Sequence, residues 1–222
     1  YLKYYYPREF MAALMTSIMD NVTKVSEYIL ACRNMGIGIL PPDINEGVSG
    51  FSVSGNSIRY GLSAIKSVGR AVVEVIISER EAGGPFSTLE DFVSRMSNRE
   101  VNKRTLESFI KSGALDSLPG TRKQKLYVSS ELLENKAREK KTVMEGQMSF
   151  FDIAPEEDKG NFQVSFPDVG EFDKETLLAF EKETLGIYVS GHPMEAYQEL
   201  WQKNVTARTS DFIVDEDGHT VV

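Results

Sequence analysis

Two short segments of this sequence carry the residue types that bind phosphate. The first is Lys66-Ser67-Val68-Gly69-Arg70, in which small and apolar residues stand between two cations. A turn of this kind at the start of a helix exposes consecutive backbone N–H groups, and small residues let an anion approach them closely. The segment, with Lys66 and Arg70 beside it, is therefore expected to bind a phosphate group.

The second segment is Lys111-Ser112-Gly113, which repeats the order of lysine, serine and glycine after a helical stretch that starts near Lys103-Arg104. A single helix–glycine–helix joint is a common tight turn and indicates little by itself. Two such joints with matched lysines favour a tandem helix-hairpin-helix, which grips the backbone of duplex DNA without reading its sequence. We therefore list all of these residues as candidate DNA contacts.

A third segment, Gln147-Met148-Ser149-Phe150-Phe151, has the composition of a short peptide that inserts into a pocket of another protein. It lies between a basic and an acidic stretch and carries no clear periodicity. One or two buried aromatic side chains can supply most of the affinity of such a motif. The alternative is a loop whose phenylalanines pack on their own domain, and the segment alone does not separate the two.

The composition is that of a globular protein. The 222 residues are 41% hydrophobic and 26% charged, which allows a sizeable core. The single cysteine excludes an internal disulfide framework, and with two histidines it leaves no recognisable zinc site. No apolar run approaches the ~20 residues of a membrane span. The first residue is Tyr1, without a signal-peptide layout, and the chain breaks off after Val222 in what reads as a strand. We expect a piece of a longer cytosolic protein.

The charge is distributed unevenly along the chain. The net charge of −8 is made up of −1 in residues 1–57, +5 in residues 58–141 and −12 in residues 142–222. A basic middle followed by an acidic end is typical of a phosphate-binding module joined to a solvating or protein-binding segment.

The hydrophobic periodicity predicts a mainly α-helical chain with one small β-hairpin. Apolar and polar residues alternate on both sides of Gly55-Asn56, which is a strong two-residue turn signal. Residues 142–170 carry several breakers and read as a linker. Helical spacing is found in residues 7–35 with a break at Asp20-Asn21, between Gly69 and Gly83, and in residues 89–96, 102–111, 122–141, 173–185 and 196–202.

These stretches together resemble the alpha subunit of bacterial DNA polymerase III, the C-family replicative DNA polymerase. The matches run in the same order over nearly the whole chain. They include Tyr6-Pro7 with Glu9-Phe10-Met11, Leu40-Pro41-Pro42-Asp43, Arg59-Tyr60-Gly61-Leu62, Phe86-Ser87-Thr88-Leu89, Asn102-Lys103-Arg104, Ile110-Lys111 with Gly113-Ala114-Leu115, and Glu183-Thr184-Leu185-Gly186. The first hairpin departs from the usual pattern, because Ser67 stands where such hairpins commonly have a glycine. In the second, Ser112 precedes Gly113, so it is expected to serve packing more than phosphate binding.

The resemblance implies a division of the chain into five parts. Residues 1–57 would end the fingers domain, and residues 58–141 would form the tandem helix-hairpin-helix module. Residues 142–170 would be a linker that carries the sliding-clamp motif, residues 171–205 a helical connector, and residues 206–222 the truncated start of an OB-fold.

The same resemblance implies the partners and the chemistry. Duplex primer–template DNA would bind the hairpins, the sliding clamp (the beta subunit) would bind Gln147–Phe151, and other replisome subunits would bind the parent protein in the bacterial cytoplasm, without a membrane. The parent would be a DNA-directed DNA polymerase whose palm carboxylates hold two Mg²⁺ ions N-terminal to this segment. No catalytic residue, metal ligand or cofactor is therefore expected here: Asp215–Asp217 reads as a solvated turn, and His192 as a structural residue.

Two other classes of protein are compatible with paired hairpins. A DNA-repair glycosylase or nuclease would need a catalytic lysine or aspartate beside the second hairpin, where Asp116 is the one candidate, or a cluster of cysteines. A helical scaffold without enzymatic activity would show no salt-dependent binding to DNA.

Overall fold

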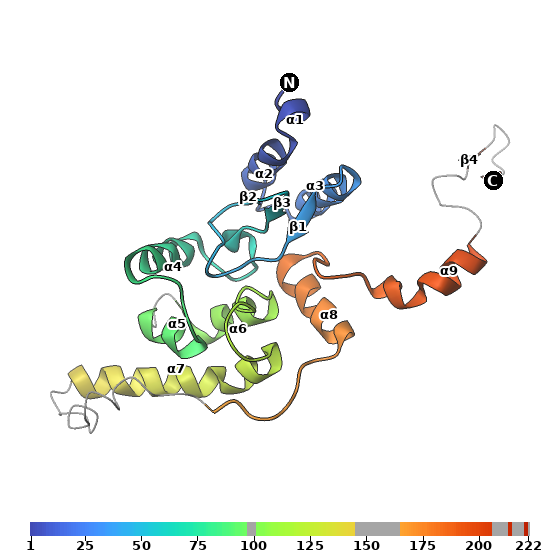
Figure 1. Ribbon diagram of the computed structural model, residues 1–222. Coiled ribbons are helices and arrows are strands. Elements are labelled where there is room, and N and C mark those ends of the chain that lie inside the picture. The colour runs from blue at the N-terminus through green and yellow to red at the C-terminus, as the bar shows by residue number, and fades with distance from the viewer. Residues whose placement is uncertain (97–100, 145–164, 206–212, 215–219, 222) are drawn as a thin grey trace. The chain divides into compact units, whose positions relative to one another are not determined.

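The structure is a computed structural model, and it describes residues 1–96, 101–144, 165–205, 213–214 and 220–221. These residues belong to two compact units, Tyr1–Ser190 and Gly191–Val222. Helices make up most of the described chain (Figure 1). The predicted fold class, mainly α with a small β-hairpin, is confirmed.

A small three-stranded sheet lies in the first unit. Strands β2 (Ser52–Ser54) and β3 (Ser57–Arg59) form the antiparallel hairpin expected from the sequence, and Gly55 has φ +58°, as a tight hairpin turn requires. Strand β1 (Gly38–Leu40) pairs in parallel with β3, so the order is β1-β3-β2. The three residues of β1 show no alternation of apolar and polar side chains, and the sequence does not predict this strand.

Three helices precede this sheet in the chain: α1 (Leu2–Tyr5), α2 (Pro7–Ser17) and α3 (Val22–Asn34). The break between α2 and α3 falls where it was expected, because the Asn21 side chain accepts a hydrogen bond from the Lys24 N–H (3.1 Å) and caps α3. Helix α2 packs against β2 and β3, and α3 packs against β1.

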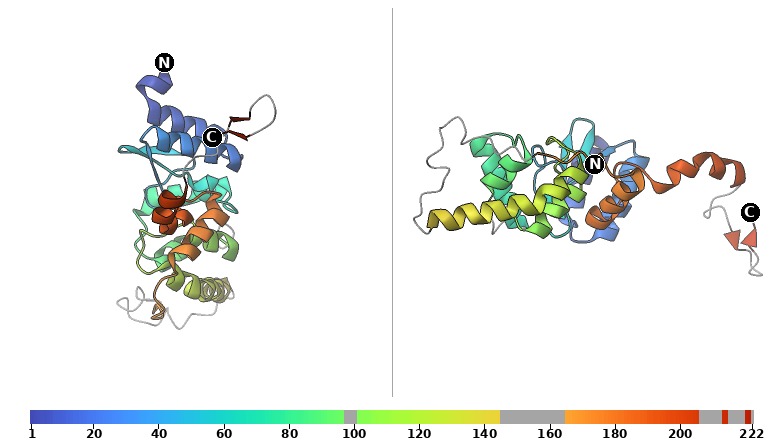
Figure 2. Two further views of the ribbon diagram at one scale, coloured as in Figure 1. Left: turned by 90° about the vertical axis from the view of Figure 1, so that its right-hand side faces the viewer. Right: turned by 90° about the horizontal axis from the view of Figure 1, so that it is seen from below.

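The helical part of the first unit follows the sheet. Its elements are a short 3-10 turn η1 (Leu62–Ala64) and the helices α4 (Arg70–Gly83), α5 (Leu89–Arg95), α6 (Lys103–Lys111) and α7 (Arg122–Met144). Thr88 and Asn102 cap α5 and α6 by accepting hydrogen bonds from the Asp91 and Thr105 N–H groups (3.1 and 3.0 Å). Helix α7 packs across both α5 and α6, as the view from below in Figure 2 shows.

Helix α8 (Lys174–Leu185) brings the chain back from the helical part to the sheet. Its N-cap is Asp173, whose carboxylate accepts a hydrogen bond from the Thr176 N–H (2.7 Å). This bond favours the charged form and lowers the pKa of Asp173. The helix packs against α6. At its end, the Tyr60 hydroxyl donates to the Leu185 carbonyl (2.9 Å).

One hydrophobic core runs through the first unit, from Met11 on α2 to Ile187 after α8. Buried residues of the sheet, such as Ile58, and of the helices, such as Phe92 and Phe109, belong to this same cluster. The residues around α8 therefore share one core with the segments around Lys66–Arg70 and Lys111–Gly113. The division of the chain into named polymerase domains stays a prediction.

The second unit contains a 3-10 turn η3 (Pro193–Tyr197), helix α9 (Gln198–Asn204) and the antiparallel strands β4 (Ile213–Val214) and β5 (Thr220–Val221). The imidazole Nδ1 of His192 accepts a hydrogen bond from the Met194 N–H (3.1 Å), so this ring helps to form the turn. That these strands begin an OB-fold stays a prediction.

Candidate phosphate-binding site

The first helical hairpin, around Lys66–Arg70, connects η1 to α4 through a strained residue. Ser67 has φ 68°, a left-handed conformation that costs a residue with a Cβ about 1–2 kcal/mol. The turn is held by the Val68 N–H, which donates to the Ile65 carbonyl (3.1 Å), and by the Lys66 N–H, which donates to the Thr184 carbonyl of α8 (2.9 Å). The serine thus occupies the position for which glycine is the least strained residue.

Helix α4 begins directly after this hairpin. Its N-cap, Gly69, offers no side chain to the N–H groups of the first turn, and nothing lies within 4 Å of the position that a Cβ would take there. The open N-terminus of a helix attracts anions through its N–H groups and its dipole. The backbone at this end of α4 is therefore accessible to a phosphate.

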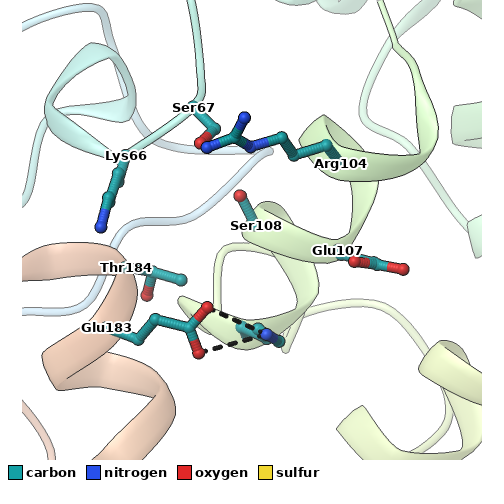
Figure 3. Close-up of a pocket in the computed structure, with 8 residues that line it drawn as sticks. Lys66, Ser67, Arg104, Glu107, Ser108, Glu183 and Thr184 are labelled. Carbon is teal, nitrogen blue, oxygen red and sulfur yellow. Dashed lines mark hydrogen bonds and ion pairs between the residues drawn. The ribbon is translucent and has the colours of Figure 1, made fainter.

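A cavity of about 210 Å³ opens beside the hairpin, between it, α6 and α8. Figure 3 shows the Arg104 side chain reaching toward Ser67, with the Ser108 hydroxyl below them. The Thr184 hydroxyl is engaged within α8, where it donates to the Phe180 carbonyl (2.7 Å). A cavity of this volume holds a phosphate group with several waters, each of which takes ~30 Å³. Its lining residues are Lys66, Ser67, Arg104, Glu107, Ser108, Lys111, Glu183 and Thr184.

The cavity unites four of the ten predicted DNA contacts: Lys66, Ser67, Arg104 and Lys111. The other residues of the first hairpin lie next to it along the chain: Val68 is buried, and Arg70 is exposed and 3.7 Å from Asp20. Lys103 lies elsewhere, in a second cavity of about 300 Å³ between the start of α6 and α7.

The second hairpin is filled by side chains of the protein itself. Gly113 has φ +82°, and a Cβ there would lie 2.3 Å from a terminal nitrogen of Arg122. Ser112 is fully buried, and its hydroxyl donates to the Phe109 carbonyl (3.0 Å). Helix α7 begins only at Arg122, so no helix follows Gly113 directly. The geometry agrees with a packing role, and a DNA contact at Ser112 and Gly113 stays a prediction.

Two buried cations stand behind the second hairpin. Burial works against the charge of Arg122, but the hydrogen bond and the charge of Asp116, 2.6 Å away, outweigh it and raise the pKa of Arg122. Burial lowers the pKa of Lys125, whose ammonium donates to the Leu115 and Leu118 carbonyls (2.8 Å each). Both cations are therefore engaged inside the protein, in contrast to those of the first hairpin.

The comparisons with known proteins agree with this geometry. Residues 36–125 match the sequence model of a helix-hairpin-helix motif. The chain is 41% identical over 199 residues to the DNA polymerase III subunit alpha of Borreliella burgdorferi, covering 90% of the chain and 17% of that protein. It is 42% identical over 200 residues to the subunit of Thermus aquaticus (90% and 16%), and 38% identical over 215 residues to that of Vibrio cholerae (95% and 18%). The chain belongs to the DNA polymerase III alpha-subunit family. It spans 16–18% of the length of these relatives.

The helix-hairpin-helix match covers both hairpins of this family member but ends before α8. Four residues of the cavity were not predicted from the sequence: Glu107, Ser108, Glu183 and Thr184. A signal for them was present, because Glu107-Ser108 and Glu183-Thr184 belong to stretches shared with the family. The proximity of Glu183 and Thr184 to Lys66 could not be read from the sequence, since α8 is far from the hairpin along the chain.

The five residues Gln147–Phe151 lie outside the described residues, so the sliding-clamp motif stays a prediction. Helix α7 ends at Met144 before this segment. The described chain resumes at residue 165, beside the start of α7. There the Gln124 side chain donates a hydrogen bond to the Pro167 carbonyl (2.9 Å), and Phe166 packs against Gly120. The segment therefore connects the two ends of α7.

In the described part of the chain, no helix combines the length and the apolar character that crossing a membrane requires. Among the same residues, no three histidine, cysteine, aspartate or glutamate side chains gather in a way that could hold a metal ion. Residues 215–217, the acidic turn, lie outside this part of the chain.

Proposed function

We propose that this chain is the segment of a bacterial replicative DNA polymerase that holds the sugar–phosphate backbone of duplex primer–template DNA. The observation that carries the proposal is the convergence of Lys66 and Arg104, from two elements distant in sequence, on an open cavity beside the first hairpin. Family membership and the match to a helix-hairpin-helix motif support it.

The chemistry of the cavity suits a phosphate rather than a base edge. Its three cations outnumber its two carboxylates, and the hydroxyls of Ser67 and Ser108 supply hydrogen-bond donors. Contacts of this type fix the position of the protein on the duplex and carry no sequence information. Binding is therefore expected to be independent of sequence and strongly dependent on salt.

The proposal extends to the sliding clamp. Gln147 would hydrogen-bond at the rim of a clamp pocket, Phe150 and Phe151 would bury apolar area in it, and Met148 and Ser149 would space them. The attachment of the segment to both ends of α7 supports a tether, since it places the motif on a connection whose two ends are fixed.

The catalytic steps are assigned to the parent protein. Nucleotidyl transfer by a DNA polymerase requires two Mg²⁺ ions held by carboxylates, and this chain is proposed to contribute grip and positioning instead. The other replisome subunits and the cytoplasm of a bacterium are proposed as the setting of the parent protein.

The decisive test replaces Lys66 and Arg104 by glutamate. We expect duplex affinity, measured by fluorescence anisotropy, to fall more than about tenfold for every sequence, and the slope of log K against log salt to flatten by about 2. The matched control, Lys3→Glu with Lys24→Glu, changes the net charge equally at exposed positions of the same unit that do not line the cavity. Equal losses in both variants, or a loss for one DNA sequence alone, would contradict the proposal.

A separate test addresses the tether. Phe150→Ala with Phe151→Ala is expected to abolish heat release on titration with a bacterial sliding clamp and to leave duplex affinity unchanged. Clamp binding that survives in the double variant would remove the motif from the proposal without affecting the phosphate site.

A further inference from the structure

One cation of the cavity is already paired. The Lys111 ammonium lies 3.1 Å from both carboxylate oxygens of Glu183 on α8, as the dashed lines in Figure 3 show. It also lies 5.2 Å from the centre of the Phe180 ring. The lysine side chain is 23% exposed and the glutamate side chain 54% exposed. The carboxylate therefore stands at the solvent side of the pair.

The position of Glu183 is fixed by its neighbours in the chain. The carbonyl of Thr184 accepts the Lys66 N–H of the hairpin (2.9 Å), and the carbonyl of Leu185 accepts the Tyr60 hydroxyl (2.9 Å). Thr184 and Leu185 are both buried. These bonds hold α8 against the hairpin, so the carboxylate is presented to the cavity by a rigid element.

A carboxylate that meets a lysine through two equivalent oxygens resembles the two free oxygens of a phosphodiester. We propose that Glu183 takes the place of a DNA backbone phosphate in the unbound chain, and that a phosphate of the duplex displaces it from Lys111. The inference rests on the proposed function, because it assigns a regulating side chain to the same cavity.

The exchange has two consequences. A partly exposed ion pair contributes little free energy, so breaking the Lys111–Glu183 pair costs little. The affinity for DNA is therefore only modestly lower than it would be if Lys111 were unpaired. The released carboxylate takes up a cation from solution, which offsets part of the counterion release that accompanies DNA binding. A single phosphate and a duplex phosphate must displace the same carboxylate, so Glu183 is expected to lower the affinity for both.

The test compares Glu183→Gln with Glu175→Gln in the whole chain. Both changes remove one negative charge from α8, but Glu175 does not line the cavity. Binding of a mixed-sequence duplex and of a mononucleotide is followed by anisotropy over a series of salt concentrations. We expect E183Q to tighten duplex binding about two- to fivefold and to steepen its salt slope by up to about 0.9. It should also improve mononucleotide binding, while E175Q stays near the wild type.

The single variant Lys111→Gln and the double variant Lys111→Gln with Glu183→Gln complete a double-mutant cycle with the wild type and E183Q. In the absence of Lys111, removal of the Glu183 charge should change duplex affinity no more than E175Q does. If the wild type binds duplex and E183Q binds it equally or more weakly, the exchange is wrong and the phosphate site stands. If neither protein shows salt-dependent binding, the proposed function fails and the exchange fails with it.

Discussion

The two hairpins have similar sequences but opposite surroundings. In the first, Gly69 faces open space at the start of α4, and its lysine and the nearby Arg104 line a cavity. In the second, Gly113 faces the guanidinium of Arg122, and the turn is buried against α7. The same residue types therefore form a solvent-facing anion site in one place and a packing joint in the other.

The difference shows that the function of such a turn depends on what occupies its concave side. Arg122, held by Asp116, supplies the second hairpin with an internal cation. The cation beside the first hairpin, Arg104, lines an open cavity instead, and Gly69 faces open space, so this hairpin stays accessible to a ligand. A glycine and a lysine at the right spacing predict the turn, but not what it binds.

The largest effect expected from this comparison is that of Gly113→Ala. The new Cβ would displace Arg122 from its partner and force a left-handed alanine, so we expect a loss of about 2–4 kcal/mol in the free energy of unfolding. Gly69→Ala, in open space at φ −82°, should change it by less than about 1 kcal/mol. Urea denaturation of the two variants measures both, and equal losses would contradict the contrast.

A smaller effect is expected at the buried Lys125. Its pKa is lowered from 10.5 in the folded protein, so between the folded and the unfolded pKa the unfolded chain binds more protons, and stability from this group rises with pH. Lys125→Met should cost about 1–2 kcal/mol at neutral pH, because two buried carbonyls lose their donor. The cost should grow as the pH approaches 10.5. If urea denaturation shows that the stability lost in Lys125→Met becomes smaller as the pH rises, the pKa of Lys125 is not lowered by folding.

Arg104→Gln tests the open hairpin with a milder change. Loss of one phosphate contact should weaken duplex binding about three- to tenfold and reduce the salt slope by about 0.9. Lys103→Gln, one residue earlier and outside the cavity, is the matched control in the same anisotropy measurement. A larger loss for Lys103→Gln would move the binding surface to the other side of α6.

The smallest effect is expected for Ser67→Gly. Relief of the left-handed serine should be partly cancelled by the greater freedom of glycine in the unfolded chain, for a net gain of about 0.5–1 kcal/mol. Thermal denaturation would detect this gain, and a loss would show that the Ser67 hydroxyl contributes more than the strain costs.

The sequence predicts the local elements well and the long-range ones poorly. Periodicity, with a break at Asp20-Asn21, locates the helices that begin near residues 22, 103 and 174 to within a residue or two, because these signals are local. Strand β1 is missed, because a parallel partner far along the chain defines it. Half of the cavity's lining residues were predicted, because its cations lie in or near the two hairpin sequences. Glu183 and Thr184 were not, because they belong to α8, which only the tertiary fold places beside the first hairpin.

Helix α7 also sets a length scale. Its 23 residues extend ~35 Å at 1.5 Å per residue, and residues 145–164 must cover that distance to return to its start. A chain of about twenty residues reaches ~70 Å at most, roughly twice what closure of the loop requires. A partner bound to Gln147–Phe151 would consequently be confined to a small volume around α7. Its local concentration near the duplex-binding surface would follow from loop length, so that lengthening the loop would dilute the partner without altering a single contact.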